Sequence, residues 1–149
     1  MSREAITLRV SGVPHPQGSK SAFVRGNRAI ITEGKGPGRQ KHADWRAAVA
    51  TAARDWQDAH QLPLLDEPLG VVVEFVMPKP RSKARWKRWP DVKPDVDKLI
   101  RSVLDSLSGV IIADDSRVVT VTASKLYGDP PGCRVTIVPL GDYEKALGR

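Results

Sequence analysis

The chain has almost no cysteine and no long apolar run. Cys133 is the single cysteine among 149 residues, so neither an internal disulfide nor a thiolate zinc site can form. The longest apolar stretch, 69–77, is interrupted by Glu74, and no run approaches the ~20 residues that a membrane span needs. The first residues also lack the apolar core of a signal peptide. We therefore expect a cytoplasmic protein without a membrane segment.

Acidic residues are outnumbered. The chain has 24 Lys and Arg against 17 Asp and Glu, for a net charge of +7. A basic excess raises the local concentration of polyanions, of which nucleic acid is the most common in a cell. The charge alone leaves open a basic protein with no nucleic-acid role. The 40% hydrophobic and 28% charged residues are typical of a globular chain, which excludes a disordered one.

Hydrophobic spacing predicts a fold of the α+β class. Alternation predicts strands, and apolar positions three and four residues apart predict two helices. The expected strands are 6–10, 23–25, 29–31, 71–76, 110–112, 118–127 and 135–138, with a hairpin turn at 26–27, and the expected helices are 41–60 and 95–108. A basic loop is expected at 33–39, and Trp45 and Trp56 of the first helix are expected in the core. The nearly continuous apolar run at 71–76 suggests a central strand buried on both faces. Without repeats or a linker, residues 1–149 are expected to form one domain, a two-layer mixed sheet with both helices packed on it.

A basic segment follows the predicted central strand. Six of the ten residues 79–88 are basic, and two tryptophans lie in or beside the segment. The residues concerned are Lys79, Arg81, Lys83, Arg85, Trp86, Lys87, Arg88 and Trp89. Such cations bind phosphates without sequence preference, and the tryptophans would stack on or wedge into exposed bases. The alternative is a solvated loop whose tryptophans pack on the sheet.

Carboxylates flank the second predicted helix. Pro94 precedes it, Asp95 is a good N-cap residue, and Asp97 falls in its first turn. Each acid also has a structural explanation as a cap, a dipole partner or a member of a solvated ion pair. A second acidic pair, Asp114 and Asp115, follows a short strand that would return alongside the helix to the same end. Four converging carboxylates require a cation, and hard oxygen ligands select Mg²⁺ or Mn²⁺.

The segments 93–107 and 109–118 together resemble the RusA family of Holliday junction resolvases. The resemblance implies that Asp95, Asp97 and Asp115 are metal-binding catalytic carboxylates, with Asp114 auxiliary to them. It further implies that Arg101 stands where the family has a catalytic lysine, and that Lys93 and Lys125 belong to the DNA-binding surface. Two further departures from the family pattern are Lys98 in place of asparagine and Arg117 in place of glutamine.

The same resemblance implies a Mg²⁺-dependent endonuclease that cuts four-way DNA junctions in recombination and repair, in a bacterial or phage-infected cell. A homodimer with two-fold symmetry would match the symmetry of such a junction. Three alternatives remain open: a nuclease for flaps or forks, a junction-binding protein without catalysis, and a sugar transferase with an Asp-x-Asp metal site. The three histidines lack ligand spacing and are expected at the surface or in loops.

Overall fold

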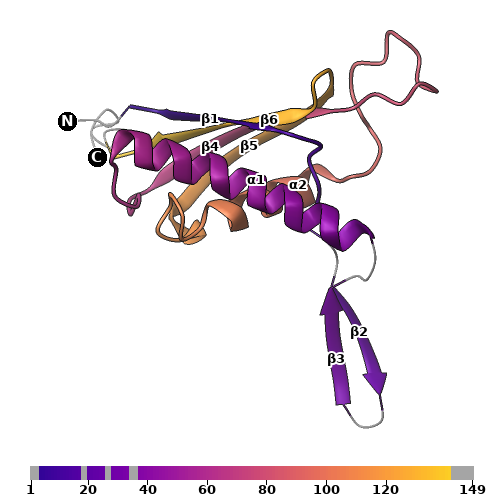
Figure 1. The fold of residues 1–149 in the computed structure, drawn as a ribbon, viewed down its shortest axis with the longest axis horizontal. Helices are drawn as coiled ribbons and strands as arrows, with labels where there is room; N and C mark the ends of the chain where they lie inside the picture. The colour runs from indigo at the N-terminus through magenta and orange to yellow at the C-terminus, as the bar shows by residue number, and fades with distance from the viewer. Residues whose placement is uncertain (1–3, 18–19, 26–27, 34–36, 142–149) are drawn as a thin grey trace.

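The computed structural model describes residues 4–17, 20–25, 28–33 and 37–141. Four strands form the main sheet, two more form a separate hairpin, and two long helices and one short 3₁₀ helix, η1, complete the fold (Figure 1). The strands are β1 (Ile6–Ser11), β2 (Lys20–Arg25), β3 (Arg28–Glu33), β4 (Leu69–Met77), β5 (Val118–Tyr127) and β6 (Gly132–Pro139). The helices are α1 (Pro37–His60), α2 (Val96–Leu107) and η1 (Asp115–Arg117).

The main sheet is mixed, with the strand order β1-β6-β4-β5. β6 pairs antiparallel with both β1 and β4, whereas β5 pairs parallel with β4. A parallel pair needs a crossover connection, and α2 supplies it between β4 and β5. Because a crossover helix runs back along the sheet, α2 begins near the ends of β4 and β5 and finishes near the start of β5.

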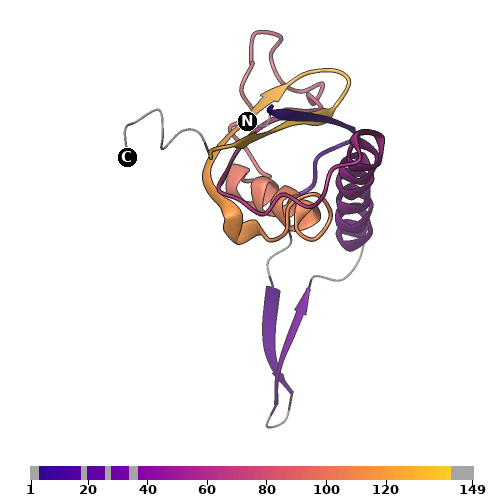
Figure 2. The same cartoon turned by 90° about the vertical axis from the view of Figure 1, so that its left-hand side faces the viewer.

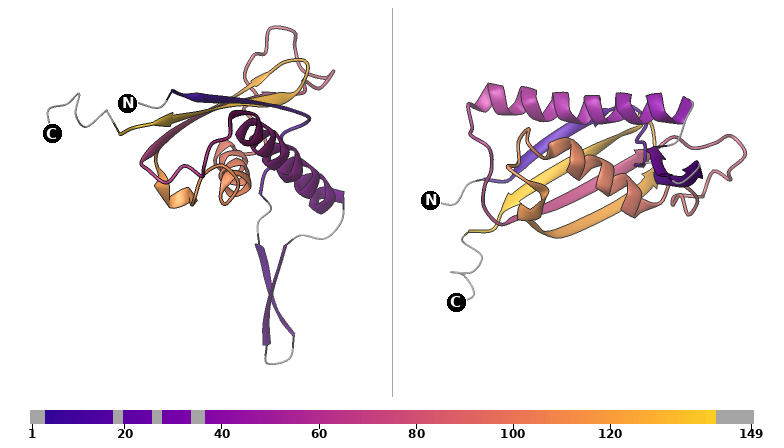
Figure 3. Two further views of the ribbon diagram at one scale, coloured as in Figure 1. Left: turned by 60° about the vertical axis from the view of Figure 1, so that its left-hand side comes forward. Right: turned by 90° about the horizontal axis from the view of Figure 1, so that it is seen from below.

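Both helices lie side by side on one face of the sheet (Figure 3). Alternate residues of the strands point into this layer, as Val73 and Phe75 of β4 do, and both are fully buried. Val49 of α1 and Leu99 and Val103 of α2 are fully buried against them. These contacts confirm the predicted α+β class and the packing of two helices on a mixed sheet. Among the described residues, no helix is both long and apolar enough to cross a membrane.

The prediction that the central strand is buried on both faces is wrong. β4 is central, but its burial alternates, and Val72 is 40% exposed. The helices cover one face, so the opposite face carries polar groups such as the ion pair between Glu74 and Arg134. The apolar run was misleading because β-branched valines also suit a solvated strand position.

The strand predicted at 110–112 is absent: residues 110 and 111 lie in a turn, and Ile112 makes only isolated bridges to Leu65 and Ser108. Ile111 and Ile112 are buried, and Leu65 closes over them: its amide donates to the Ile111 carbonyl at 2.9 Å, and its carbonyl accepts from the Ala113 amide at 2.9 Å. Gly109, with a φ of 78°, begins this reversal, in a conformation that glycine adopts without strain. The chain therefore turns beneath the last turn of α2 and does not return along the helix.

The predicted hairpin is present, since β2 and β3 pair antiparallel from Lys20–Glu33 to Arg25–Arg28. It projects away from the body of the molecule (Figure 2). Its expected turn at 26–27 lies outside the described residues. Cys133 lies buried in β6, where burial raises the pKa of its thiol to about 12, so it is a structural residue.

Candidate active site and nucleic-acid interface

The first acidic pair stands at the start of α2. Asp95 is the N-cap residue, and its carbonyl accepts from the Leu99 amide at 3.1 Å, but its carboxylate makes no capping hydrogen bond. Asp97 lies in the first turn, and both residues are exposed. In the described part of the chain, Asp97 forms no ion pair with Arg101, which is also exposed. Neither carboxylate is thus used by the fold.

The second acidic pair has a different setting. The carboxylate of Asp114 accepts a hydrogen bond from the Ser116 amide at 3.0 Å and caps η1. Hydrogen bonds from Ser116 hold the pKa of this carboxyl below its ordinary value. Arg117, at the end of η1, pairs with Asp66 at 2.6 Å, Nε to Oδ1. Asp115 is exposed beside these contacts. Asp114 therefore has a structural task that Asp95 lacks.

The two acidic pairs lie at opposite ends of α2. The helix has 12 residues, a length of about 18 Å, and η1 follows the turn beneath its last residues. Lys125, seven residues into β5, reaches the start of α2, whereas η1 directly precedes the first residue of β5. The expected meeting of all four carboxylates within one chain is therefore wrong, because the segment after α2 turns instead of returning along it.

The structure does not gather a full set of protein ligands for a metal from the residues it describes, but the two carboxylates at the start of α2 suit Mg²⁺. Within the described ranges, no group of three or more His, Cys, Asp or Glu side chains is arranged to hold an ion. Mg²⁺, however, typically takes one or two carboxylates and completes its shell with waters and phosphate oxygens. Asp95 and Asp97, exposed in one helical turn, fit that requirement, while Asp115 of the same chain does not reach them.

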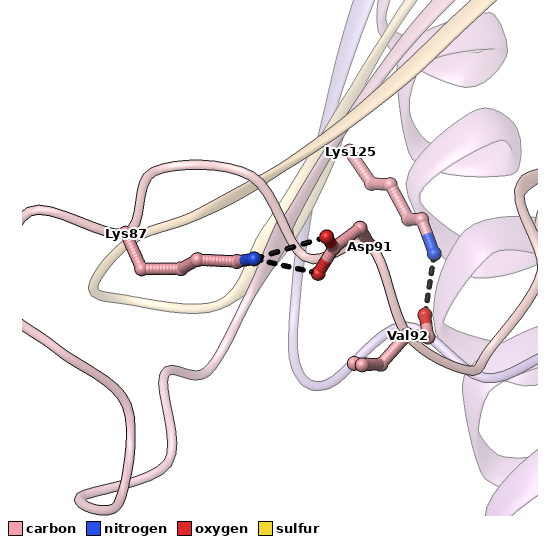
Figure 4. Close-up of polar contacts among 4 residues, drawn as sticks. All are labelled: Lys87, Asp91, Val92 and Lys125. Carbon is pink, nitrogen blue, oxygen red and sulfur yellow. Dashed lines mark hydrogen bonds and ion pairs between the residues drawn. The ribbon is translucent and has the colours of Figure 1, made fainter.

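A lysine fixes the segment that leads into α2. Lys125 Nζ donates to the carbonyl of Val92 at 2.6 Å (Figure 4). It also donates to the carbonyl of Pro94 at 2.7 Å. Lys87 pairs with Asp91 at 2.9 Å in the same view. Lys125 was expected to bind DNA, but two of its three donors hold backbone carbonyls next to Asp95. These two bonds hold the segment that leads into the acidic turn, and the expected role of Lys125 in DNA binding stays a prediction.

The basic segment folds over a hollow. Four of its cations, Lys79, Arg85, Lys87 and Arg88, line a hollow of about 700 Å³ together with Tyr127 and the turn before β6. Lys79 Nζ donates to the Arg85 carbonyl at 2.8 Å and lies 5.9 Å from the centre of the Tyr127 ring. Trp86 is 83% exposed and Trp89 is 58% exposed. The alternative in which these tryptophans pack on the sheet is therefore wrong, in contrast to Trp45, which is buried as predicted.

Three residues near Asp95 were not predicted to belong to the site. His15, Gln17 and Lys41 line a second hollow together with Lys93 and Asp95. The Gln17 amide donates to the carbonyl of Lys98 at 3.2 Å, which attaches the 13–17 segment to the first turn of α2. No local pattern signals this contact, because about 80 residues separate the two segments. The expectation that all histidines lie at the surface or in loops is wrong for His42, which is buried in α1.

Comparison with known proteins gives two matches. The family model described as endodeoxyribonuclease RusA matches residues 14–138, a range that includes both acidic pairs and the basic segment. A relative from Bacillus subtilis (strain 168), described as uncharacterized protein YqaN, is 27% identical over 144 residues. These residues cover 90% of this chain and 96% of the relative.

Proposed function

Because this chain belongs to the RusA endodeoxyribonuclease family, we propose that it is a Mg²⁺-dependent endonuclease that resolves four-way DNA junctions in recombination and repair. Mn²⁺ would substitute for Mg²⁺. One observation carries the proposal: Asp95 and Asp97 present carboxylates that the fold does not use, directly after a basic segment with exposed tryptophans. A solvated helix start would not require this combination.

The basic segment is proposed to hold the DNA. Arg85 and Arg88 are exposed where they line the 700 Å³ hollow, and Arg81 is exposed nearby in the sequence. These cations can exchange counterions for phosphates, so affinity should fall steeply with salt. Trp86 and Trp89 offer ring faces to the unstacked bases of a branch point. Lys93 continues the basic surface toward Asp95, since it is exposed and directly precedes Pro94.

Asp95 and Asp97 are proposed to hold the ion. When bound, such an ion activates a water and neutralises charge on the phosphate that is cut. Arg101 lies one turn after Asp97 on an exposed helix face, where its planar guanidinium can bind two oxygens of that phosphate. Unlike a lysine, it would remain charged and would not donate a proton.

The proposed homodimer gives Asp115 a place in this scheme. Within one chain, about 18 Å of helix separates it from the first turn of α2. In a two-fold dimer with antiparallel α2 helices, the start of one helix would face the end of the other. Asp115 of a second copy, with Asp114 beside it, would then complete the shell of the ion. The same arrangement gives two equivalent sites, one for each strand to be cut.

The test compares Asp97→Asn with Asp58→Asn, a matched loss of one exposed carboxylate on α1. We expect Asp97→Asn to bind a mobile four-way junction as the parent does but to lose cutting by about 10³-fold or more, because the ligand of the ion is gone. Asp58→Asn should bind and cut like the parent. Equal cutting by Asp97→Asn and the parent would remove the proposed site.

The substrate is tested with the parent protein on a four-way junction, a flap, a fork and a plain duplex of the same sequence. Paired cuts at the four-way junction support the proposal, and faster cutting of flaps or forks would replace the junction as substrate. Binding without a nick in Mg²⁺ or Mn²⁺, even in protein excess, would show a junction-binding protein without catalysis.

A further inference from the structure

The hollow beside Asp95 is built from three segments that are distant in sequence. The segment 13–17 forms one side, α1 contributes Lys41, and the residues before and within the first turn of α2 contribute Lys93, Asp95 and Lys98. Its volume is about 490 Å³. The bond from the Gln17 amide to the Lys98 carbonyl, at 3.2 Å, fixes the distance between the first segment and α2. The hollow is therefore a feature of the folded domain and not of one loop.

A neighbouring hollow of about 440 Å³ continues this one along α1. Val13, His15 and Lys41 line both, so Lys41 lies where the two meet. His15 Nδ1 lies 3.2 Å from the Pro16 carbonyl, a contact that fixes its ring at the same junction. Together the two adjoining hollows form a groove that leads from α1 to Asp95.

The charge of this groove is unbalanced at the end near Asp95. Lys41 and Lys93 are exposed, and neither forms an ion pair with a carboxylate in the described part of the chain. Among the described residues, Asp95 is the one acidic residue that lines this hollow, and Asp44 lines the neighbouring one. Ammonium groups around a single carboxylate leave a net positive hollow, which favours an anion as its occupant.

We propose that this hollow binds a phosphodiester group of the DNA strand, adjacent to the phosphate that is cut, with Lys41 and Lys93 as its ligands. The position relative to the cut rests on the proposed function of Asp95. Aside from the imidazole of His15 and the neutral amide of Gln17, the lining side chains are apolar and non-aromatic or charged, so the hollow suits a phosphate better than a stacked base. Lys41 would then set how the strand enters the acidic turn.

The experiment compares Lys41→Gln with Arg54→Gln. Both changes remove one positive charge from an exposed position of α1, but Arg54 lies 13 residues further along the helix, about 20 Å away. Binding is measured without metal on four-way junctions that carry one neutral methylphosphonate, placed in turn at each position around the branch point. Cutting by saturating protein is measured on the unmodified junction.

With the parent protein and with Arg54→Gln, we expect one methylphosphonate position to weaken binding about 10-fold, the effect of losing one charged contact. With Lys41→Gln, the same position should have less than a 2-fold effect, because the contact is already absent. Lys41→Gln should also slow cutting at saturation, and Arg54→Gln should not.

Identical methylphosphonate profiles for Lys41→Gln and the parent would overturn the proposed phosphate site. The parent protein could also fail to cut although one methylphosphonate position weakens its binding only when Lys41 is present. This result would support the phosphate site and contradict the proposed nuclease activity. The methylphosphonate profile therefore tests the phosphate site, and cutting by the parent protein tests the proposed nuclease activity.

Discussion

The two ends of α2 carry the same kind of side chain in opposite states. At its start, Asp95 and Asp97 are exposed, and their carboxylates have no bonding partner among the residues that the structure describes. At its end, Asp114 is bound to the Ser116 amide, and Arg117 is paired with Asp66. The bonding partners of a carboxylate, more than its place in a motif, therefore show whether it has a structural role or is available to bind a ligand.

The ends also differ in what supports them. The start of α2 is held by Lys125, which donates to the carbonyls of Val92 and Pro94, and it follows the basic segment in the sequence. The end of α2 rests on a turn that buries Ile111 and Ile112. One end therefore presents uncommitted acids in a fixed frame, and the other closes the hydrophobic core.

The largest effect is expected when two inactive variants are mixed and the cutting activity of the mixture is measured. Asp97→Asn and Asp115→Asn are each expected to abolish cutting in the proposed dimer. A mixed dimer would contain one site with both residues intact if Asp115 acts on a second copy. We expect the mixture to recover nicking of the junction, from none to a readily measured fraction of the parent rate. Lack of recovery, with exchange of subunits demonstrated, would show that Asp115 does not act across the dimer.

Releasing the start of α2 should have the next largest effect. In Lys125→Met, two charge-assisted hydrogen bonds to the segment before Asp95 are lost, each with a typical value of about 1.5–3 kcal/mol. We expect cutting at saturation to fall about 10- to 100-fold, whereas the salt dependence of junction binding stays unchanged because no phosphate contact is lost.

Lys125→Arg is the matched variant, since it keeps the charge and the donors. Partial recovery of the cutting rate by Lys125→Arg would support a positioning role. A reduced salt slope for junction binding in Lys125→Met would contradict it and would return Lys125 to the DNA-binding surface.

The smallest effect is expected at the end of α2. Asp114→Asn replaces the charged cap of η1 by a neutral acceptor, so we expect a small decrease in Tm at pH 6. Hydrogen bonds from Ser116 lower the pKa of Asp114 in the folded protein from its ordinary value of 3.8. Its contribution is therefore present above that value and is lost as the pH falls through the folded pKa. The difference in Tm between the two proteins should shrink as the pH falls below 3.8, and a difference that does not shrink would contradict the assignment.

The sequence predicts best what is local. The apolar positions of α2 recur every three or four residues and bury Leu99 and Val103, so helical spacing was sufficient to find the helix and to place Asp97 in its first turn. The structure begins α1 at Pro37, four residues before the predicted start. Proline is common in the first turn of helices, so Pro37 belongs to the helix and not to the predicted basic loop.

Contacts between distant segments were not predictable in this way. The bond from Gln17 to Lys98 and the bonds from Lys125 to the segment before Asp95 join residues with no shared periodicity. The course of the chain after α2 depends on whether Ile111 and Ile112 pack under the helix or extend as a strand. Both conformations bury the same side chains, so the hydrophobic pattern could not distinguish them.

The position of the bound ion can be measured directly. In an isotope-labelled sample, small additions of Mn²⁺ broaden the NMR signals of amides near the bound ion. We expect the amides of residues 95–98 to broaden first, with Asp115 among them if the site is shared across a dimer, while those of 54–58 in α1 remain sharp. Broadening confined to other parts of the chain, or equal broadening in Asp97→Asn, would contradict the proposed metal site at the start of α2.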